Sequence, residues 1–225
     1  MNKMNQWQGK KWYCYGTSMT DITLSDGTSR PSYSKYLAEY AGLEMHNFGK
    51  GGSGIIPRFH GDDNIKTRCM RLDDGKAEAD LITVEIIPND FLGELGNVTD
   101  LCDETFCGNL NQIIEYLLLN TNATVAILTA SRSRYKYDNE SVKFLPTGRT
   151  TKKWLDWEDA ISTICRMHGI QFWNGASEAG LGYYRTCKDN ALVQDQIHLT
   201  EKGAEVLGKY FLGKLNSIYP YEINN

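Results

Sequence analysis

Five short apolar stretches occur along the chain, and longer segments with a helical repeat separate them. The five are rich in aromatic and β-branched residues and end at glycine or polar residues, as buried strands do. They cover residues 12–17, 43–49, 80–87, 123–130 and 170–175. We therefore expect five strands that alternate with helices.

Apolar residues recur at helical spacing in the segments between these strands. The predicted helices cover residues 31–42, 104–120 and 151–169, with Pro31 suited to a first turn and Gly169 to a helix end. A last predicted helix follows Thr200, a candidate N-cap. Its apolar face is formed by Ala204, Leu207, Phe211 and Leu215.

Strands that alternate with helices predict right-handed crossovers and a parallel sheet covered on both faces. The expected fold is therefore α/β, a three-layer α/β/α sandwich around a five-stranded, mainly parallel sheet. At 225 residues, without an internal repeat or an obvious linker, the chain is expected to form a single domain over 1–225. In such a sheet, groups beyond the carboxyl ends of the strands meet at one edge.

Composition narrows the classes of function. A net charge of −4, from 24 basic and 28 acidic residues, gives no overall basic field for nucleic acid. No apolar run approaches the roughly 20 residues that span a bilayer, and the first residues are too polar for a secretory signal, so we expect no membrane span and a soluble, cytoplasmic protein. No Cys-x-x-Cys spacing occurs, and the histidines at 46, 60 and 168 lack metal-ligand spacing, so neither a metal nor a cofactor is predicted.

Four polar or glycine-rich stretches lie where the predicted elements bring them to one edge of the sheet. They are YGTSMTD at 15–21, NFGKGGSG at 47–54, IIPNDF at 86–91 and DQIHLT at 195–200. A serine hydroxyl is a poor nucleophile until a base accepts its proton, and a histidine oriented by a carboxylate is a common base. The hypothesis is that Ser18 is the nucleophile, His198 the base and Asp195 the carboxylate that orients it.

Acyl transfer also needs hydrogen-bond donors aimed at the oxyanion. We expect the side-chain amide of Asn89 and the backbone N–H groups of Ser18 and Gly52 to supply them, with Gly51 as the alternative to Gly52. Asn89 and Asp90 have a simpler interpretation as residues that stabilise a turn through their own side chains.

The four stretches resemble the four blocks of SGNH (GDSL-type) hydrolases, in the family's order. The matching residues are Gly16-Thr17-Ser18, Asn47 to Gly52, Pro88-Asn89-Asp90, and Asp195 to His198. The resemblance implies a flavodoxin-like sandwich with strand order 2-1-3-4-5 and ester hydrolysis as the activity. It implies Ser18 as nucleophile, Gly52 and Asn89 in the oxyanion hole, and Asp195 with His198 as the remaining dyad.

The chain departs from the family pattern at two places. Thr17 stands where the family usually has aspartate, and Ile87-Pro88 replaces a glycine and a small residue before Asn-Asp. Thr17 can still form hydrogen bonds within its turn. Pro88 lacks an N–H and restricts the backbone directly before Asn89, which affects the direction in which the Asn89 side-chain amide points.

The loops at 131–150 and 174–190 are polar and are expected to border the same edge. The aromatic residues near these loops are Trp154, Trp157, Trp173, Tyr183 and Tyr184. Most of them are expected to belong to the core, and any that are exposed can stack on sugar rings. The basic residues of the loops suit acidic saccharides. We therefore expect a carbohydrate esterase that hydrolyses short-chain acyl esters, O-acetyl esters above all. Two alternatives remain. One is a lipase or acyl-thioesterase of the same family, and the other is a carbohydrate-binding or structural module with little turnover, in a phage or cell-surface assembly.

Overall fold

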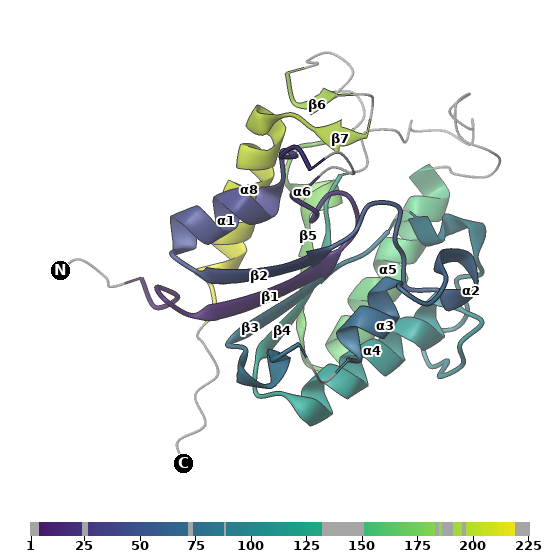
Figure 1. Ribbon diagram of the computed structural model, residues 1–225. Helices are drawn as coiled ribbons and strands as arrows, with labels where there is room; N and C mark the ends of the chain where they lie inside the picture. Colours follow the sequence, from purple (N-terminus) through teal and green to yellow (C-terminus); the bar gives the residue numbers. More distant parts are fainter. Residues whose placement is uncertain are drawn as a thin grey trace.

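A computed structural model describes residues 5–23, 27–71, 74–87, 89–131, 151–182, 185, 191–194 and 197–218. Its centre is a five-stranded sheet with strand order β2-β1-β3-β4-β5, in which every pair is parallel (Figure 1). The strands are β1 (Lys11–Gly16), β2 (Glu44–Gly49), β3 (Leu81–Glu85), β4 (Thr124–Thr129) and β5 (Gln171–Asn174). The predicted strands, their order and the fold class are confirmed.

Within the described residues, four long helices connect or follow the strands: α1 (Tyr33–Ala41), α4 (Phe106–Asn120), α5 (Thr151–Met167) and α8 (Glu201–Leu215). Shorter helices are α2 (Pro57–His60), α3 (Ile65–Cys69) and α6 (Gly175–Glu178), with 3₁₀ turns η1 (Lys76–Glu78) and η2 (Asn89–Leu92). Strands β6 (Val193–Gln194) and β7 (His198–Leu199) form a separate antiparallel pair just before α8.

The three central strands β1, β3 and β4 are buried on both faces, which explains why these strands are mainly apolar. Along β1, Trp12 and Cys14 join the core beneath α1 and α8, whereas Tyr13 and Tyr15 join the core beneath α3, α4 and α5. Figure 1 shows these two helical layers on opposite sides of the sheet. The three-layer arrangement therefore follows from the twofold alternation of side chains along each strand.

Side-chain caps fix where the helices begin. Thr200 caps α8 as predicted, because its hydroxyl accepts the backbone N–H of Gly203 at 3.2 Å. The predicted helix at 31–42 begins instead at Tyr33, because Ser32 is extended and its hydroxyl accepts the N–H of Ser34. Gly42 ends that helix in the left-handed conformation, with φ of 66°.

Among the residues that the structure describes, no helix is both long enough and apolar enough to cross a membrane. The cysteines described, at 14, 69, 102, 107 and 165, are all free thiols.

Candidate active site

Ser18 and His198 meet beyond the carboxyl end of β1. Gly16 is the last residue of β1, so Ser18 lies on the turn that leaves the sheet, and His198 lies in β7, directly before α8. The Nε2 atom of His198 is 3.0 Å from the Oγ atom of Ser18, although 180 positions separate the two residues in the chain. At this distance the imidazole can accept the hydroxyl proton.

The third member of the predicted triad, Asp195, lies outside the described residues. Its role in orienting His198 therefore stays a prediction from the sequence.

The turn that carries Ser18 is closed by its own backbone. The carbonyl of Thr17 accepts the N–H groups of Thr20 at 3.1 Å and Asp21 at 3.0 Å. Arg30 donates to the carbonyl of Ser18 at 3.1 Å and anchors the turn from outside. Within the described part of the chain, the N–H of Ser18 has no acceptor.

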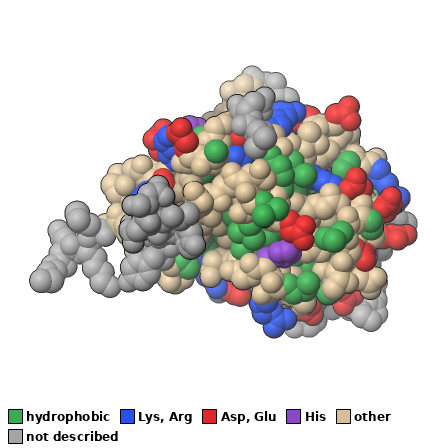
Figure 2. Space-filling model, turned by 90° about the horizontal axis from the view of Figure 1, so that it is seen from below, with side chains coloured by type: hydrophobic (Ala, Val, Ile, Leu, Met, Phe, Trp, Pro, Cys, Tyr) green, Lys and Arg blue, Asp and Glu red, His purple; other side chains and the backbone are tan. Residues whose placement is uncertain are grey.

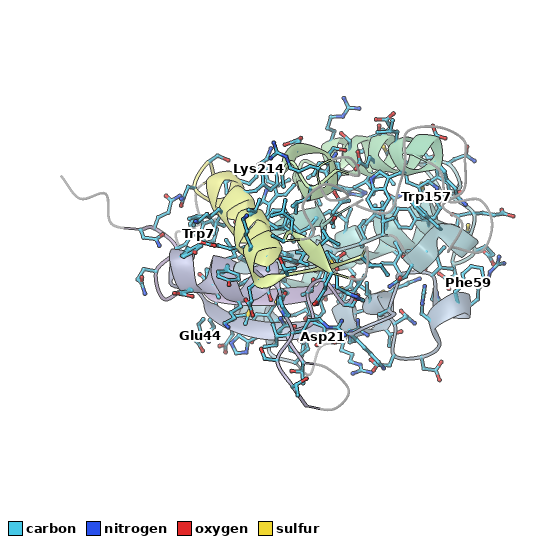
Figure 3. All side chains as sticks on the ribbon, turned by 90° about the horizontal axis from the view of Figure 1, so that it is seen from above. Trp7, Asp21, Glu44, Phe59, Trp157 and Lys214 are labelled. Atoms are coloured by element: carbon cyan, nitrogen blue, oxygen red, sulfur yellow. The ribbon has the colours of Figure 1, made fainter. Side chains whose placement is uncertain are left out.

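The glycine-rich loop after β2 packs directly against this turn. A Cβ atom on Gly49 would lie 2.4 Å from the backbone nitrogen of Asp21, so only glycine fits there. The N–H of Gly51 donates to the carboxylate of Asp21 at 3.1 Å, and Figure 3 labels Asp21 on the loop beyond β1. Gly52 has a positive φ of 73°, and its N–H meets no acceptor among the described residues. Of the two glycines left open by the sequence, Gly52 is therefore the one whose N–H is not already engaged.

The block after β3 is tied to the same loop by two side chains. Asn89 donates through Nδ2 to the carbonyl of Ser53 at 2.7 Å, which leaves the second hydrogen of its amide for another acceptor. Asp90 is fully buried and accepts the N–H groups of Ile55 and Ile56, both at 2.9 Å. These two side chains reach 34 to 36 positions back along the chain, which is a longer-range role than stabilising their own turn.

Ile87 has a φ of 61°, which places a β-branched residue in the left-handed region. This conformation is strained for any residue except glycine, and it occurs two residues before Asn89. Ile87 stands where the family pattern has glycine. Its side chain is 1% exposed, and this burial helps to offset the strain. Ile87 therefore departs from the family pattern in its side chain but has the positive φ that glycine favours. Pro88 itself lies outside the described residues.

Arg68, on α3, is a site residue that the sequence analysis missed. Its buried guanidinium donates to the carbonyl of Phe48 at 3.1 Å, to the carbonyl of Gly16 at 3.3 Å and to the hydroxyl of Ser53 at 3.0 Å. It thus joins the ends of β1 and β2 to the glycine-rich loop. Burial lowers the pKa of the guanidinium. No motif in the sequence distinguishes Arg68 from a surface arginine.

Glu85 is the second residue that was missed. It ends β3, is 0% exposed, and accepts both the backbone N–H and the hydroxyl of Thr17, each at 2.7 Å. Burial raises its pKa to about 7, against the opposing effect of the hydrogen bonds from Thr17. The available signal was a carboxylate flanked by apolar residues, Val84 and Ile86, in the middle of a predicted buried strand.

The aromatic residues considered for sugar stacking belong to the core where they are described. Trp154, Trp157 and Trp173 are each 1% exposed or less, and Figure 3 labels Trp157, which belongs to α5. Trp157 packs against Phe91 and Phe106, with ring centroids 4.8 and 4.5 Å apart. The expectation that most of these aromatic residues are core is therefore confirmed for the three tryptophans, whose rings are not available for stacking on a sugar. Tyr183 and Tyr184 lie outside the described residues.

A cavity of about 500 Å³ lies at the opposite end of the sheet, between the start of β4 and the end of α5. Leu118, Val125, His168 and Ile170 are among its lining residues, and none of the predicted site residues is. Figure 2 shows the underside of the molecule, where hydrophobic side chains are interspersed with charged ones. Within the described ranges, no three His, Cys, Asp or Glu side chains lie close enough to hold a metal ion.

Comparison with known proteins finds similarity at the level of structure. No protein-family model matches the chain, and no curated protein sequence matches it. A protein from Lactobacillus plantarum shares 22% identity and a TM-score of 0.76, over 94% of this chain and 99% of the other.

Two further solved structures come from hydrolases. A substituted form of an acetyl xylan esterase from Geobacillus stearothermophilus has 16% identity and a TM-score of 0.63, over 99% of this chain and all of the other. A protein described as a GDSL-like lipase from Parabacteroides merdae has 14% identity and a TM-score of 0.64, over 93% of this chain and 96% of the other. These similarities establish that the chain has the α/β fold of SGNH hydrolases.

Proposed function

We propose that this chain is a serine esterase of the SGNH type, which hydrolyses short-chain acyl esters through an acyl-enzyme on Ser18. The observation that carries the proposal is the 3.0 Å distance between Ser18 Oγ and His198 Nε2. A buried or half-buried serine–histidine contact occurs in many proteins, but this one lies at the strand edge where the fold gathers reactive groups.

In the first half of the reaction, His198 Nε2 accepts the proton of Ser18 as Oγ attacks the ester carbonyl carbon. The new Oγ–C bond turns the carbonyl oxygen into an oxyanion. When the intermediate collapses, the bond to the alcohol oxygen breaks and the imidazolium of His198 returns its proton to that oxygen. The products of this half are a free alcohol and an acyl group on Ser18.

In the second half, water takes the place of the alcohol. His198 accepts a proton from the water while the water oxygen attacks the acyl carbon. The bond from that carbon to Ser18 Oγ then breaks, and His198 returns the proton to Oγ. The net reaction consumes one ester and one water and yields an alcohol and a carboxylic acid. Asp195, in the predicted role, holds the imidazole in the tautomer that presents Nε2 to Ser18.

Three donors are proposed for the oxyanion in both halves. They are the N–H groups of Ser18 and Gly52, which have no acceptor within the described residues, and the second hydrogen of the Asn89 amide. Arg68, Asp90 and the Asn89–Ser53 hydrogen bond support this assignment, because they fix the loops on which these donors lie. Donors that are already oriented stabilise the developing charge without a reorganisation cost.

The surroundings of Ser18 favour a short, polar substrate over a lipid. The large apolar side chains exposed in the described part of the chain are Leu101, Leu118, Leu119, Leu155 and Met167. All lie on α4, α5 or the loop before α4, and none lies on the loops that carry Ser18, Gly52, Asn89 or His198. Those loops instead carry Asp21 and Arg30, whose side chains bind the backbone of Gly51 and Ser18. A carbohydrate O-acetyl ester fits this chemistry, and the acetyl xylan esterase among the similar structures supports it.

Hydrolysis of 4-nitrophenyl acetate by the wild-type protein and by Ser18→Ala tests the proposal. We expect turnover by the wild type and none above background by the variant, with both proteins equally folded. Wild-type turnover that Ser18→Ala retains would refute the mechanism. A wild type without turnover that still binds glycans would favour the alternative of a binding or structural module.

A further inference from the structure

Thr17 and Glu85 together bring a carboxylate to the turn before Ser18, whereas the family pattern has that carboxylate on the residue before the nucleophile itself. The resemblance to SGNH hydrolases has an acidic residue directly before the nucleophile, where this chain has Thr17. In the structure, a carboxylate reaches the same turn from the end of β3. The Oε2 atom of Glu85 accepts the N–H of Thr17 at 2.7 Å, its hydroxyl at 2.7 Å and the hydroxyl of Thr20 at 3.2 Å.

The packing around Glu85 allows this carboxylate little freedom. A Cβ atom on Gly16 would lie 2.8 Å from Glu85 Oε2 and 2.2 Å from the hydroxyl of Thr20, so Gly16 must be glycine for the carboxylate to approach the turn. The hydroxyl of Thr20 is held in turn by that of Tyr33 on α1, at 2.8 Å. The last residue of β1 and the two threonines therefore enclose one oxygen of Glu85.

The charged groups around Glu85 do not stabilise its carboxylate. The ionisable groups that face it are Asp90, from η2, and Tyr33, from α1. No cation forms an ion pair with it in the described part of the chain, and its Oε1 atom has no hydrogen-bond partner there. A buried carboxylate without a cation opposes folding, so a stabilising ion pair does not account for Glu85.

We propose that Glu85 is a positioning residue, which holds the Thr17–Ser18 turn so that Ser18 Oγ faces His198. This inference rests on the proposed esterase function. Glu85 is bonded to the residue directly before the nucleophile, at both its backbone and its side chain. Loss of these hydrogen bonds frees the turn to rotate and moves the hydroxyl of Ser18 away from the imidazole. Substrate binding depends on other loops and is largely retained.

Moving the carboxylate from position 85 to position 17 provides the test. The enzymes compared are the wild type, Glu85→Leu, and the double variant Thr17→Asp/Glu85→Leu, which places the carboxylate where the family pattern has it. The readouts are kcat and KM for an acetyl ester, with kcat expressed per folded molecule, and the rate at which a serine-directed phosphonate labels Ser18. Thermal unfolding is measured for each protein.

We expect Glu85→Leu to lower kcat about 100-fold, the usual cost of a misplacement of about 1 Å, with KM changed by less than about threefold. The double variant is expected to recover at least about tenfold of this loss, because a carboxylate again orders the turn. If Glu85→Leu does not fold, Glu85→Gln is used in both single and double variants. Glutamine keeps the shape and one acceptor but loses the charge, and its expected loss of kcat is about tenfold.

Glu158→Leu is the matched control. Glu158 is also a buried carboxylate with three side-chain donors, Trp154, Asn174 and Ser177. These described partners lie on α5, β5 and α6, not on the loops that carry Ser18, Gly52, Asn89 and His198. The control is expected to lose stability and to keep kcat per folded molecule.

Each outcome decides the inference. An active wild type whose kcat is unchanged by Glu85→Leu, or not recovered by Thr17→Asp, overturns the positioning role alone. An equal loss of kcat in Glu158→Leu also overturns it, since the effect is then one of general stability. A wild type that neither hydrolyses the ester nor reacts with the phosphonate overturns the proposed function, and this inference with it.

Discussion

The side-chain amide of Asn89 donates to the backbone carbonyl of Ser53 at 2.7 Å, and this joins the block after β3 to the glycine-rich loop after β2. Asp90, the next residue, reinforces the connection through the N–H groups of Ile55 and Ile56. Two of the three proposed oxyanion donors, Asn89 and Gly52, therefore lie on segments that are fixed to each other. Their relative position does not depend on the substrate.

Removing the Asn89 amide should slow the chemical step. We expect Asn89→Ala to lower kcat by about 10²–10³ with little change in KM, the usual cost of one oxyanion donor. Asn111→Ala is a suitable control, because the Asn111 amide donates to the carbonyls of Val98 and Asp100, in a separate loop. Steady-state kinetics on an acetyl ester decide the matter. An unchanged kcat would show that the free hydrogen of Asn89 points away from the oxyanion.

Ser18 and His198 should behave as one unit in kinetics. We expect His198→Ala to lower kcat by about 10⁴–10⁶, nearly as much as Ser18→Ala, and the double variant to be no worse than either. Asp195→Asn should be severe but leave measurable turnover. His168→Ala is the control, because His168 bonds Asn111 at the opposite end of the sheet. Losses that simply add in the Ser18/His198 double variant would contradict a shared step.

Acyl length should separate an esterase for small groups from a lipase. Because the described loops around Ser18 expose no large apolar side chain, a long acyl chain gains little from burial there. We expect kcat/KM to fall in the order acetyl, butyryl, octanoyl and palmitoyl, and acetate to be released from acetylated glycans. A preference for octanoyl or longer chains would contradict the carbohydrate proposal.

The buried carboxyl of Glu85 should make stability fall as the pH rises. Its pKa is about 7 in the folded protein against an ordinary value of 4.5, so the folded state binds more protons than the unfolded state between these values. The contribution of the protonated Glu85 carboxyl to the free energy of unfolding is complete below about pH 4.5 and is lost as the pH rises through 7. The loss is about 3 kcal/mol at most.

Urea unfolding of the wild type and of Glu85→Gln at pH 5 and pH 8 measures this effect. The difference in unfolding free energy between wild type and variant should become less favourable to the wild type at pH 8. A difference that is the same at both pH values would show that Glu85 does not titrate in this range.

The fold could be predicted because its strands and helices are marked by patterns of neighbouring residues in the sequence. The stretch at 80–87 is mainly apolar because β3 is covered on both faces. Thr200 caps its helix through a hydrogen bond to a residue three positions away. The start of α1 was misjudged by two residues, because Pro31 and Ser32 are both suited to a helix start. The cap hydrogen bond, which the sequence does not show, selects Ser32.

The candidate site could be predicted only in part. Ser18 and His198 were identifiable because each belongs to a short motif beside an expected element. Arg68 and Glu85 were not, because their roles come from contacts with carbonyl and hydroxyl groups, and with the N–H of Thr17, that lie 15 to 68 positions away in the chain. Trp154, Trp157 and Trp173 were expected to belong mainly to the core although they lie near the polar loops in sequence, and their rings do fill the core.

The proposed function depends on acylation of Ser18 with the help of His198. Its most direct test is labelling by a serine-directed phosphonate, with the modified peptide identified by mass spectrometry in the wild type, in Ser18→Ala and in His198→Ala. We predict one phosphonate per wild-type molecule, attached to Ser18, no label in Ser18→Ala and strongly slowed labelling in His198→Ala. Label on another residue, or undiminished labelling of Ser18→Ala, would contradict the account.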